Sequence, residues 1–199
     1  MPKLSLTDFV DVVLKSGTPK ATKIVQVKER PDYHPALDYY KKLRDRVIET
    51  HSEGKDKAFL SNLIPEIDDQ KKIQNYVDIV GAYKKWWGRK QLEWFDPPNK
   101  HFSHNGIDVM VNPELGLRIN GEPHLIKLYF KPDPLRKNRT EIITHLMAKC
   151  LSDEVEVGTK MSILDIRSAN LISPTVPIAS LDAMLMAELA YIAALWPAI

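Results

Sequence analysis

Apolar residues in the first half of the chain recur every three or four positions, which is the spacing of amphipathic helices. The pattern predicts a helix over residues 7–15, with Thr7 as its N-terminal cap and Gly17 closing it. Residues 21–30 then alternate like a strand, although so short a segment could equally be a connector. Further helices are predicted over residues 35–54, 56–63 and 68–87.

The pattern changes after residue 88. Proline, asparagine and glycine residues predict a loop over residues 88–106. Short alternating runs beyond this loop have the period of strands. The predicted strands cover residues 107–111, 115–119, 124–130 and 160–172. Helical spacing returns over residues 135–150, before the last strand, and over residues 180–196 at the end.

This order of elements predicts an α/β fold. The β-β-β-α-β succession implies a small mixed sheet flanked by helices. We expect residues 1–90 to form a helical N-terminal subdomain. Residues 91–199 would then form the α/β core together with its C-terminal helix.

A tight hairpin is the strongest local signal in the sequence. Asn120-Gly121 separates two strand-like runs, and these residue types suit a two-residue turn with positive φ at both positions. Such a turn sets the register of the two strands. The expected cross-strand neighbours are Ile119 with Glu122, Leu117 with His124, Leu115 with Ile126, Glu114 with Lys127, and Asn112 with Tyr129.

Alternation along the hairpin divides its side chains into two faces. The face expected to pack on the core carries Leu115, Leu117, Ile119, Ile126, Leu128 and Phe130. The polar face carries Asn112, Glu114, Gly116, Arg118, Lys127, Tyr129 and Lys131. One interpretation of the polar face is structural: an ion pair between Glu114 and Lys127 on a partly solvated sheet, worth roughly 0.2–1 kcal/mol.

The second interpretation of the hairpin is functional. The segment "NPELGLRINGEPHLIKLYFK" (112–131), with the helix at 139–150 and the strand "SILDIRSANLI" after it, resembles the core of the PD-(D/E)xK nuclease superfamily. The resemblance covers about half of the chain. It implies a restriction-endonuclease-like fold and magnesium-dependent cleavage of DNA. In that family, an acid on one strand and an acid-x-lysine motif on the next strand hold the magnesium ions.

Carried over to this chain, the resemblance gives a degenerate motif. Glu114 takes the place of the first acid and is the magnesium ligand that the resemblance implies. The acid-x-lysine positions fall on Lys127 and Tyr129, so a lysine replaces the second acid and a tyrosine replaces the lysine. A cationic Lys127 repels a metal ion there. The family therefore implies catalytic positions at Glu114, Lys127 and Tyr129, with magnesium as the cofactor and cleavage compromised.

A basic turn follows the third predicted strand. The stretch "KPDPLRKNR" is expected to lie near the hairpin, where it could contact phosphates, or to be a solvated loop. Its nucleic-acid-binding candidates are Lys131, Arg136, Lys137 and Arg139. "YKKWWGRK" (83–90) would suit stacking on a single strand. Core packing is the alternative for Trp86, Trp87 and Trp94.

Other chemistry is sparse along the chain. His101 and His104 have the spacing of two metal ligands, but no third ligand completes a zinc site. Cys150 has no nucleophile signature around it, and a buried thiol is its expected state. The sequence contains no phosphate-loop, dinucleotide-binding or nucleophile-elbow motif.

Composition changes this picture little. The chain has 199 residues, one cysteine and a formal net charge of +2, so any basic surface must be local. The N-terminus lacks the pattern of a signal peptide, and the apolar run at 189–199 is too short to span a bilayer. We therefore expect a cytoplasmic protein without a membrane partner. The two functional hypotheses are a nucleic-acid-associated protein of degenerate nuclease type, and a non-catalytic scaffold that binds a protein partner or a second copy of itself.

Overall fold

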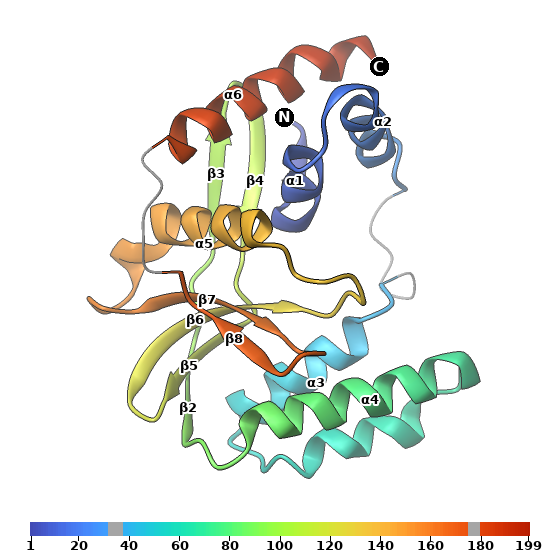
Figure 1. Ribbon diagram of the computed structural model, residues 1–199, viewed down its shortest axis with the longest axis vertical. Coiled ribbons are helices and arrows are strands. Elements are labelled where there is room, and N and C mark those ends of the chain that lie inside the picture. The colour runs from blue at the N-terminus through green and yellow to red at the C-terminus, as the bar shows by residue number, and fades with distance from the viewer. Residues whose placement is uncertain (32–37, 175–179) are drawn as a thin grey trace.

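Two β-sheets form the frame of the computed structural model, which describes residues 1–31, 38–174 and 180–199 (Figure 1). The larger sheet has the order β2-β5-β6-β7-β8. Its strands are β2 (Leu92–Phe95), β5 (Leu115–Ile119), β6 (Glu122–Tyr129), β7 (Lys160–Asp165) and β8 (Asn170–Ile172). Only β6 and β7 run parallel, so the sheet is mixed. The smaller sheet has the order β1-β4-β3, from β1 (Lys3–Ser5), β4 (Ile107–Val111) and β3 (Lys100–His104).

Helices cover both faces of the larger sheet (Figure 1). One face carries α3 (Lys41–Ser52), the 3-10 helix η2 (Phe59–Glu66) and α4 (Gln70–Trp87). The other face carries α1 (Leu6–Val13), α5 (Lys137–Leu151) and α6 (Leu181–Leu195) together with the smaller sheet. The remaining helices of the described residues are α2 (Gly17–Lys28), η3 (Ser152–Glu154) and η4 (Trp196–Ala198). The protein is thus of the α/β class, with small mixed sheets flanked by helices.

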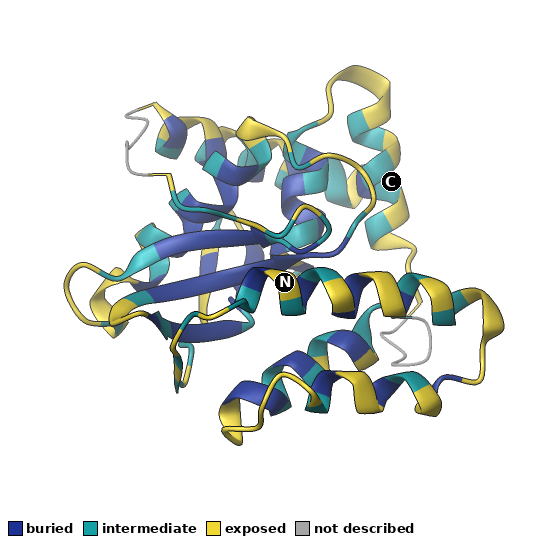
Figure 2. Ribbon diagram, turned by 60° about the horizontal axis from the view of Figure 1, so that its bottom comes forward, coloured by how far each residue is buried: buried dark blue, intermediate teal, exposed yellow. Residues whose placement is uncertain are grey.

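The predicted hairpin is confirmed in its turn and in its register from Leu115 to Ile119, but the expected pairing of Asn112 with Tyr129 is wrong, because the ladder begins at Leu115 and Asn112 contacts Lys127 instead. Asn120 and Gly121 have φ values of 51° and 90°, as a two-residue turn of this kind requires. Leu115 pairs with Ile126 and Ile119 with Glu122, with the intervening pairs also as expected. The six residues assigned to the apolar face are all buried against α3, η2 and α4, where the strands are coloured as buried in Figure 2.

The loop expected at 88–106 was wrong, since this segment contains β2 and β3, and β2 pairs with β5. The strand expected at 107–111 is confirmed as β4, but it belongs to the smaller sheet and not to the sheet of the hairpin. Gly116 explains the close approach of β2, since a Cβ there would lie 2.3 Å from the carbonyl oxygen of Phe95.

Further local expectations were also wrong. Residues 21–30 are mostly helix, because Ile24 is buried and Val27 packs partly against the core at helical spacing. The N-cap of α1 is Ser5, whose Oγ accepts a hydrogen bond from the Asp8 amide, in place of Thr7. The strand expected over residues 160–172 is the antiparallel pair β7 and β8. The segment expected at 56–63 is the 3-10 helix η2, and the start of the helix expected at 35–54 lies partly outside the described residues.

The N-terminal segment packs with the C-terminal half of the chain. Strand β1 pairs in parallel with β4, and Phe9 and Val10 of α1 share a core with Leu146 of α5 and Leu185 of α6. The division into residues 1–90 and 91–199 stays a prediction, but this packing crosses it.

Helix α6 is the most apolar helix of the chain. The stretch Leu181–Ala198 is long and apolar enough, by length and composition alone, to cross a membrane. Four residues of the helix, at helical spacing, are buried against the core. These are Leu181, Leu185, Leu189 and Ile192. A core-covering role therefore accounts for one side of the helix.

Candidate functional site: a charged groove along the hairpin

A buried ion pair joins the two strands of the hairpin. Lys127 Nζ lies 2.6 Å from Glu114 Oε1 and donates to the carbonyl oxygen of Asn112 at 2.7 Å, with Asn112 Oδ1 3.4 Å away. Glu114 Oε2 accepts the backbone amide of Leu128 at 2.8 Å. The predicted pairing is therefore present. The partly solvated setting expected for it is wrong, since the two side chains are only 10% and 12% exposed.

The setting differs because the polar face of the hairpin is covered. Leu125 and Tyr129 lie in the same row as Lys127, and both belong to the core beneath α1 and α5. Three acceptors surround the ammonium group of Lys127, which has three protons to donate. The lysine thus connects β6 to the turn that precedes β5.

Tyr129 has a local structural contact. Its hydroxyl donates to the backbone carbonyl of Asp133 at 2.9 Å, which connects the end of β6 to the Pro-Asp-Pro turn. Burial raises the pKa of this phenol, so it stays protonated and neutral at physiological pH. A neutral phenol held in this way does not supply the positive charge of the lysine that the nuclease motif has at this position.

The residues at the hairpin do not fit a magnesium site. Magnesium requires several oxygen ligands in near-octahedral geometry. Both carboxylate oxygens of Glu114 already accept hydrogen bonds, one of them from an ammonium group. Among residues 1–31, 38–174 and 180–199, no three His, Cys, Asp or Glu side chains are grouped so that they could hold a metal ion.

The other carboxylates near the hairpin are also matched to cations. Arg30 donates to both oxygens of Asp8, at 2.8 Å and 2.7 Å. Burial alone raises the pKa of Asp8, but the hydrogen bonds from Arg30 and Ser5 outweigh it and the net pKa is lowered. Asp38 lies 2.7 Å from Arg44. In each of these ion pairs, the arginine balances the negative charge of the carboxylate.

Asp11 of α1 connects to the basic turn in the same way. Arg139 lies 2.6 Å from it and Lys131 lies 3.1 Å from it. Burial again raises the pKa of Asp11, and the hydrogen bond and charge of Arg139, with those of Lys131, lower it further than burial raises it. Two of the predicted phosphate-contacting residues are thus held against α1 by an aspartate that sequence spacing gave no reason to associate with them.

Three hollows follow one another along the hairpin because neighbouring hollows share lining residues. The first has a volume of about 900 Å³ and shares Glu114 and Lys127 with the second, of about 170 Å³. The second shares Lys131 and Arg139 with the third, of about 590 Å³. We call these three adjoining hollows together the hairpin groove.

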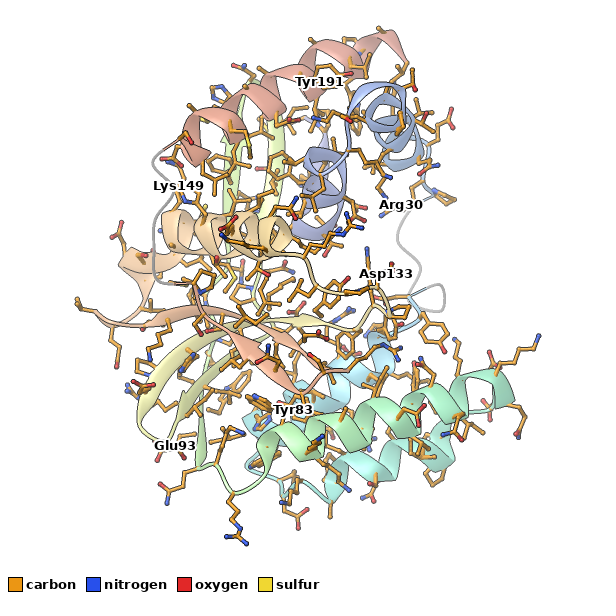
Figure 3. The ribbon with its side chains drawn as sticks, in the orientation of Figure 1. Arg30, Tyr83, Glu93, Asp133, Lys149 and Tyr191 are labelled. Atoms are coloured by element: carbon orange, nitrogen blue, oxygen red, sulfur yellow. The ribbon has the colours of Figure 1, made fainter. Side chains whose placement is uncertain are left out.

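The two ends of the hairpin groove differ in chemistry. Residues from its two ends, Arg30 and Asp133, are labelled in Figure 3. The Trp94 end is the first hollow, whose main polar and aromatic residues are Asp8, Arg30, Asp38, Arg44, Trp94, Asn99, Asn112, Glu114 and Lys127. The basic end is the third hollow, whose charged residues are Lys15, Lys23, Lys131, Arg136 and Arg139, with Asp11 and Asp133. Of the two ends, the basic end has the excess of positive charge, because cations and carboxylates balance at the Trp94 end.

Most of the residues predicted for the site line the hairpin groove. The predicted residues found there are Glu114, Lys127, Tyr129, Lys131, Arg136 and Arg139. Lys137 does not appear in the lining. Its side chain is 90% exposed and lies 3.6 Å from Glu141 on the next turn of α5. The groove residues that sequence reasoning missed come from the N-terminal half, chiefly Asp8, Asp11, Arg30, Asp38 and Arg44.

The other candidates lie elsewhere. Trp86 is buried and the Trp87 ring lies 4.6 Å from that of His51, so both pack within the helical layer. His101 Nδ1 lies 2.5 Å from Asp108 Oδ2, without a further ligand among the described residues. Cys150 is half-buried, and burial raises the pKa of its thiol.

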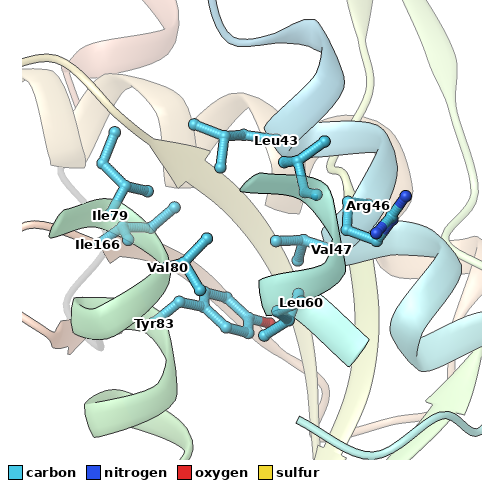
Figure 4. A pocket seen from close by; sticks show the side chains of 9 residues that line it. Leu43, Arg46, Val47, Leu60, Ile79, Val80, Tyr83 and Ile166 are labelled. Atoms are coloured by element: carbon cyan, nitrogen blue, oxygen red, sulfur yellow. The ribbon is translucent and has the colours of Figure 1, made fainter. Parts of the chain in front are cut away.

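A separate hollow lies between the helices that cover the apolar face of the sheet (Figure 4). Its volume is about 10 Å³, which is room for one water molecule at most. Leu43, Val47, Leu60 and Val80 are among its lining residues, and such apolar walls offer a water few partners. This hollow is a packing gap and carries no ligand chemistry.

Comparisons of the chain with models of known protein families, with curated proteins and with solved structures found no match.

Proposed function

We propose that this protein binds nucleic acid without cleaving it, on a restriction-endonuclease-like core whose catalytic position is closed by an internal ion pair. The observation that carries the proposal is the contact between Lys127 and Glu114 at the two positions where the family resemblance implies carboxylates. The succession β5, β6, α5, β7, with β6 and β7 parallel, agrees with the order that the resemblance implies.

Binding is assigned to the basic end of the hairpin groove. Phosphate oxygens are held by lysine and arginine, and each contact releases counterions. Arg136 and Lys15 are exposed there, and within the described residues neither forms an ion pair with a carboxylate. Arg136 also begins α5, whose first turn contains no acidic residue, and the positive end of a helix favours anions. The phosphates of a nucleic-acid strand would therefore meet an excess of positive charge at the basic end of the groove.

The test of binding is fluorescence polarisation with labelled oligonucleotides in EDTA over a series of salt concentrations. We expect the affinity to fall as salt rises, with a logarithmic slope of about −0.7 to −0.9 for each phosphate contact. Arg136→Ala and Lys15→Ala should each weaken binding and reduce the slope by about one contact. Lys71→Ala is the matched control, because Lys71 is exposed, lies outside the lining of the hairpin groove and is not part of the stretch at 83–90.

The test of the missing activity is an incubation with single- and double-stranded DNA in magnesium and in manganese. We expect no cleavage by the wild-type protein. Metal-dependent cleavage that disappears in Glu114→Gln would overturn the non-catalytic part of the proposal, and salt-independent or absent binding would overturn the nucleic-acid part.

The alternative is a non-catalytic protein-interaction scaffold, and the outer side of α6 favours it. Met184 and Tyr191 of this helix are large apolar residues that are 39% and 43% exposed. Sedimentation analysis of the wild type and of Tyr191→Glu tests it: a wild-type oligomer that becomes monomeric in the variant would support the scaffold function.

A further inference from the structure

The Trp94 end of the hairpin groove has the composition of a site for an unpaired base. Trp94 lies on β2, partly buried against the core beneath α3 and α4, and its indole Nε1 donates to Asp96 at 3.0 Å. Pro97 and Ile48 line the same hollow and extend its apolar surface. Aromatic side chains in such grooves hold the bases of single strands by stacking, which is worth a substantial factor in affinity for each base.

Polar groups around Trp94 suit a neutral ligand better than a phosphate. Asn99 and Asn112 bring side-chain amides to the hollow, and amides match the donors and acceptors on the edges of bases. The cations there are matched by carboxylates, as in the pair of Arg30 with Asp8. Arg30 uses two of its five N–H groups in that pair and is 49% exposed, so the others can reach a sugar or phosphate beside the base.

The middle of the hairpin groove is narrow. Its volume of about 170 Å³ lies below the ~300 Å³ that ordinary ligand pockets begin at. Tyr40 and Phe130 line it, with their rings stacked at a centroid distance of 5.2 Å. A strand that connects a base at the Trp94 end to phosphates at the basic end would cross this middle hollow beside the two stacked rings.

We infer that the hairpin groove binds single-stranded nucleic acid in preference to duplex, with one unpaired base on Trp94 and the strand's phosphates at the basic end. This inference rests on the proposed function and adds the strandedness of the ligand. A duplex keeps its bases stacked inside, and exposing one of them to Trp94 requires the energy of unpairing it.

The experiment compares one labelled DNA strand of about 16 nucleotides, its RNA equivalent and its DNA duplex, in EDTA and low salt. We expect either single strand to bind at least tenfold more tightly than the duplex. Trp94→Ala should weaken single-strand binding roughly 5- to 150-fold, the range for loss of one stacked base. The same substitution should leave duplex affinity and the salt slope unchanged. Arg136→Ala should weaken both ligands and reduce the slope.

Trp94→Phe keeps a stacking ring and guards against a folding defect in Trp94→Ala. It should retain most of the single-strand affinity, while the quenching of tryptophan fluorescence on binding should diminish. Equal affinity for single strand and duplex, with no effect of Trp94→Ala, would overturn this inference and leave the proposed function standing. Quenching that is unchanged in Trp94→Phe would also overturn it. Binding to none of the three ligands would remove the proposed function as well.

Discussion

Removing one partner of the hairpin ion pair should destabilise the fold strongly. Lys127→Met replaces the ammonium group with an apolar group of similar length. Glu114 would keep only the Leu128 amide as a donor, and the carbonyl oxygen of Asn112 would lose its donor. The carboxylate would remain where its side chain is only 12% exposed, so water from the hairpin groove could replace the lysine only in part.

The size of the effect follows from this burial. Breaking a buried ion pair by removing one partner costs about 3–5 kcal/mol, whereas an exposed pair is worth about 0–1 kcal/mol. For a chain of 199 residues, each kilocalorie lowers the melting temperature by roughly 2–4 °C. Lys127→Met should therefore lower it by about 6–20 °C. Replacing both partners, in Glu114→Gln with Lys127→Met, should recover much of that loss because no charge is left buried.

The assay is urea unfolding of the wild type, both single variants and the double variant, followed by circular dichroism. The four free energies of unfolding form a double-mutant cycle, and we expect a coupling energy of about 2 kcal/mol or more between Glu114 and Lys127. A loss below about 1 kcal/mol in Lys127→Met would refute the reasoning, because it would place the pair in the range of solvated surface ion pairs.

Further predictions concern the buried histidine and two glycines. Burial lowers the pKa of His51 from 6.5 to about 4. As the pH falls from 7.5 to 5, the unfolded chain therefore takes up a proton on this histidine while the folded protein stays largely unprotonated there. Stability should thus fall by about 2 kcal/mol between pH 7.5 and pH 5, and less in His51→Phe, as measured by urea unfolding at both pH values. Gly116→Ala would bring a Cβ to 2.3 Å from the Phe95 carbonyl and should cost about 1–3 kcal/mol or abolish folding, read from melting temperature. Gly121→Ala has open space around it but a φ of +90°, so it should fold and should cost about 1–3 kcal/mol through backbone strain alone, in the same assay.

The hairpin could be predicted because its determinants are local. A two-residue Asn-Gly turn leaves one register, and period-2 alternation then decides which side chains share a face. Glu114 and Lys127 were paired correctly on this basis. Their burial could not be predicted, because it depends on α1 and α5, which cover the face from segments far away in the chain.

The misassigned elements show where local patterns are insufficient. Strand β2 has only four residues and is followed closely by two prolines, so the local sequence favours a loop. Its strand conformation depends on pairing with β5, which is possible because Gly116 has no side chain in the way of Phe95. Helix α2 contains Ile24, Val25 and Val27, whose alternation resembles a strand as much as a helix. In both segments the tertiary contacts select one of two conformations that the local sequence allows.

Only the part of the hairpin groove that comes from the hairpin and the basic turn could be predicted from the sequence. The residues on the hairpin and the basic turn are neighbours in the sequence, so their proximity could be expected. Lys131 and Asp11 are 120 positions apart, and no spacing rule connects them. Arg30 and Arg44 lie on either side of residues 32–37, in a region where sequence gave only a helix boundary.

The pairing of carboxylates with cations along the hairpin groove would affect both the binding and the cleavage of a nucleic-acid strand. A phosphodiester is repelled by an unpaired carboxylate, and nucleases of the implied family overcome this repulsion with a bound metal ion. Here Lys127 neutralises Glu114 from within the chain, and Arg30 and Arg44 do the same for Asp8 and Asp38. On the proposed function, a nucleic-acid strand can therefore approach the hairpin in EDTA as well as in magnesium. On the same proposal, the carboxylates of Glu114, Asp8 and Asp38 are engaged by cations instead of a metal ion, so the feature that would permit binding would also remove the means of cleavage.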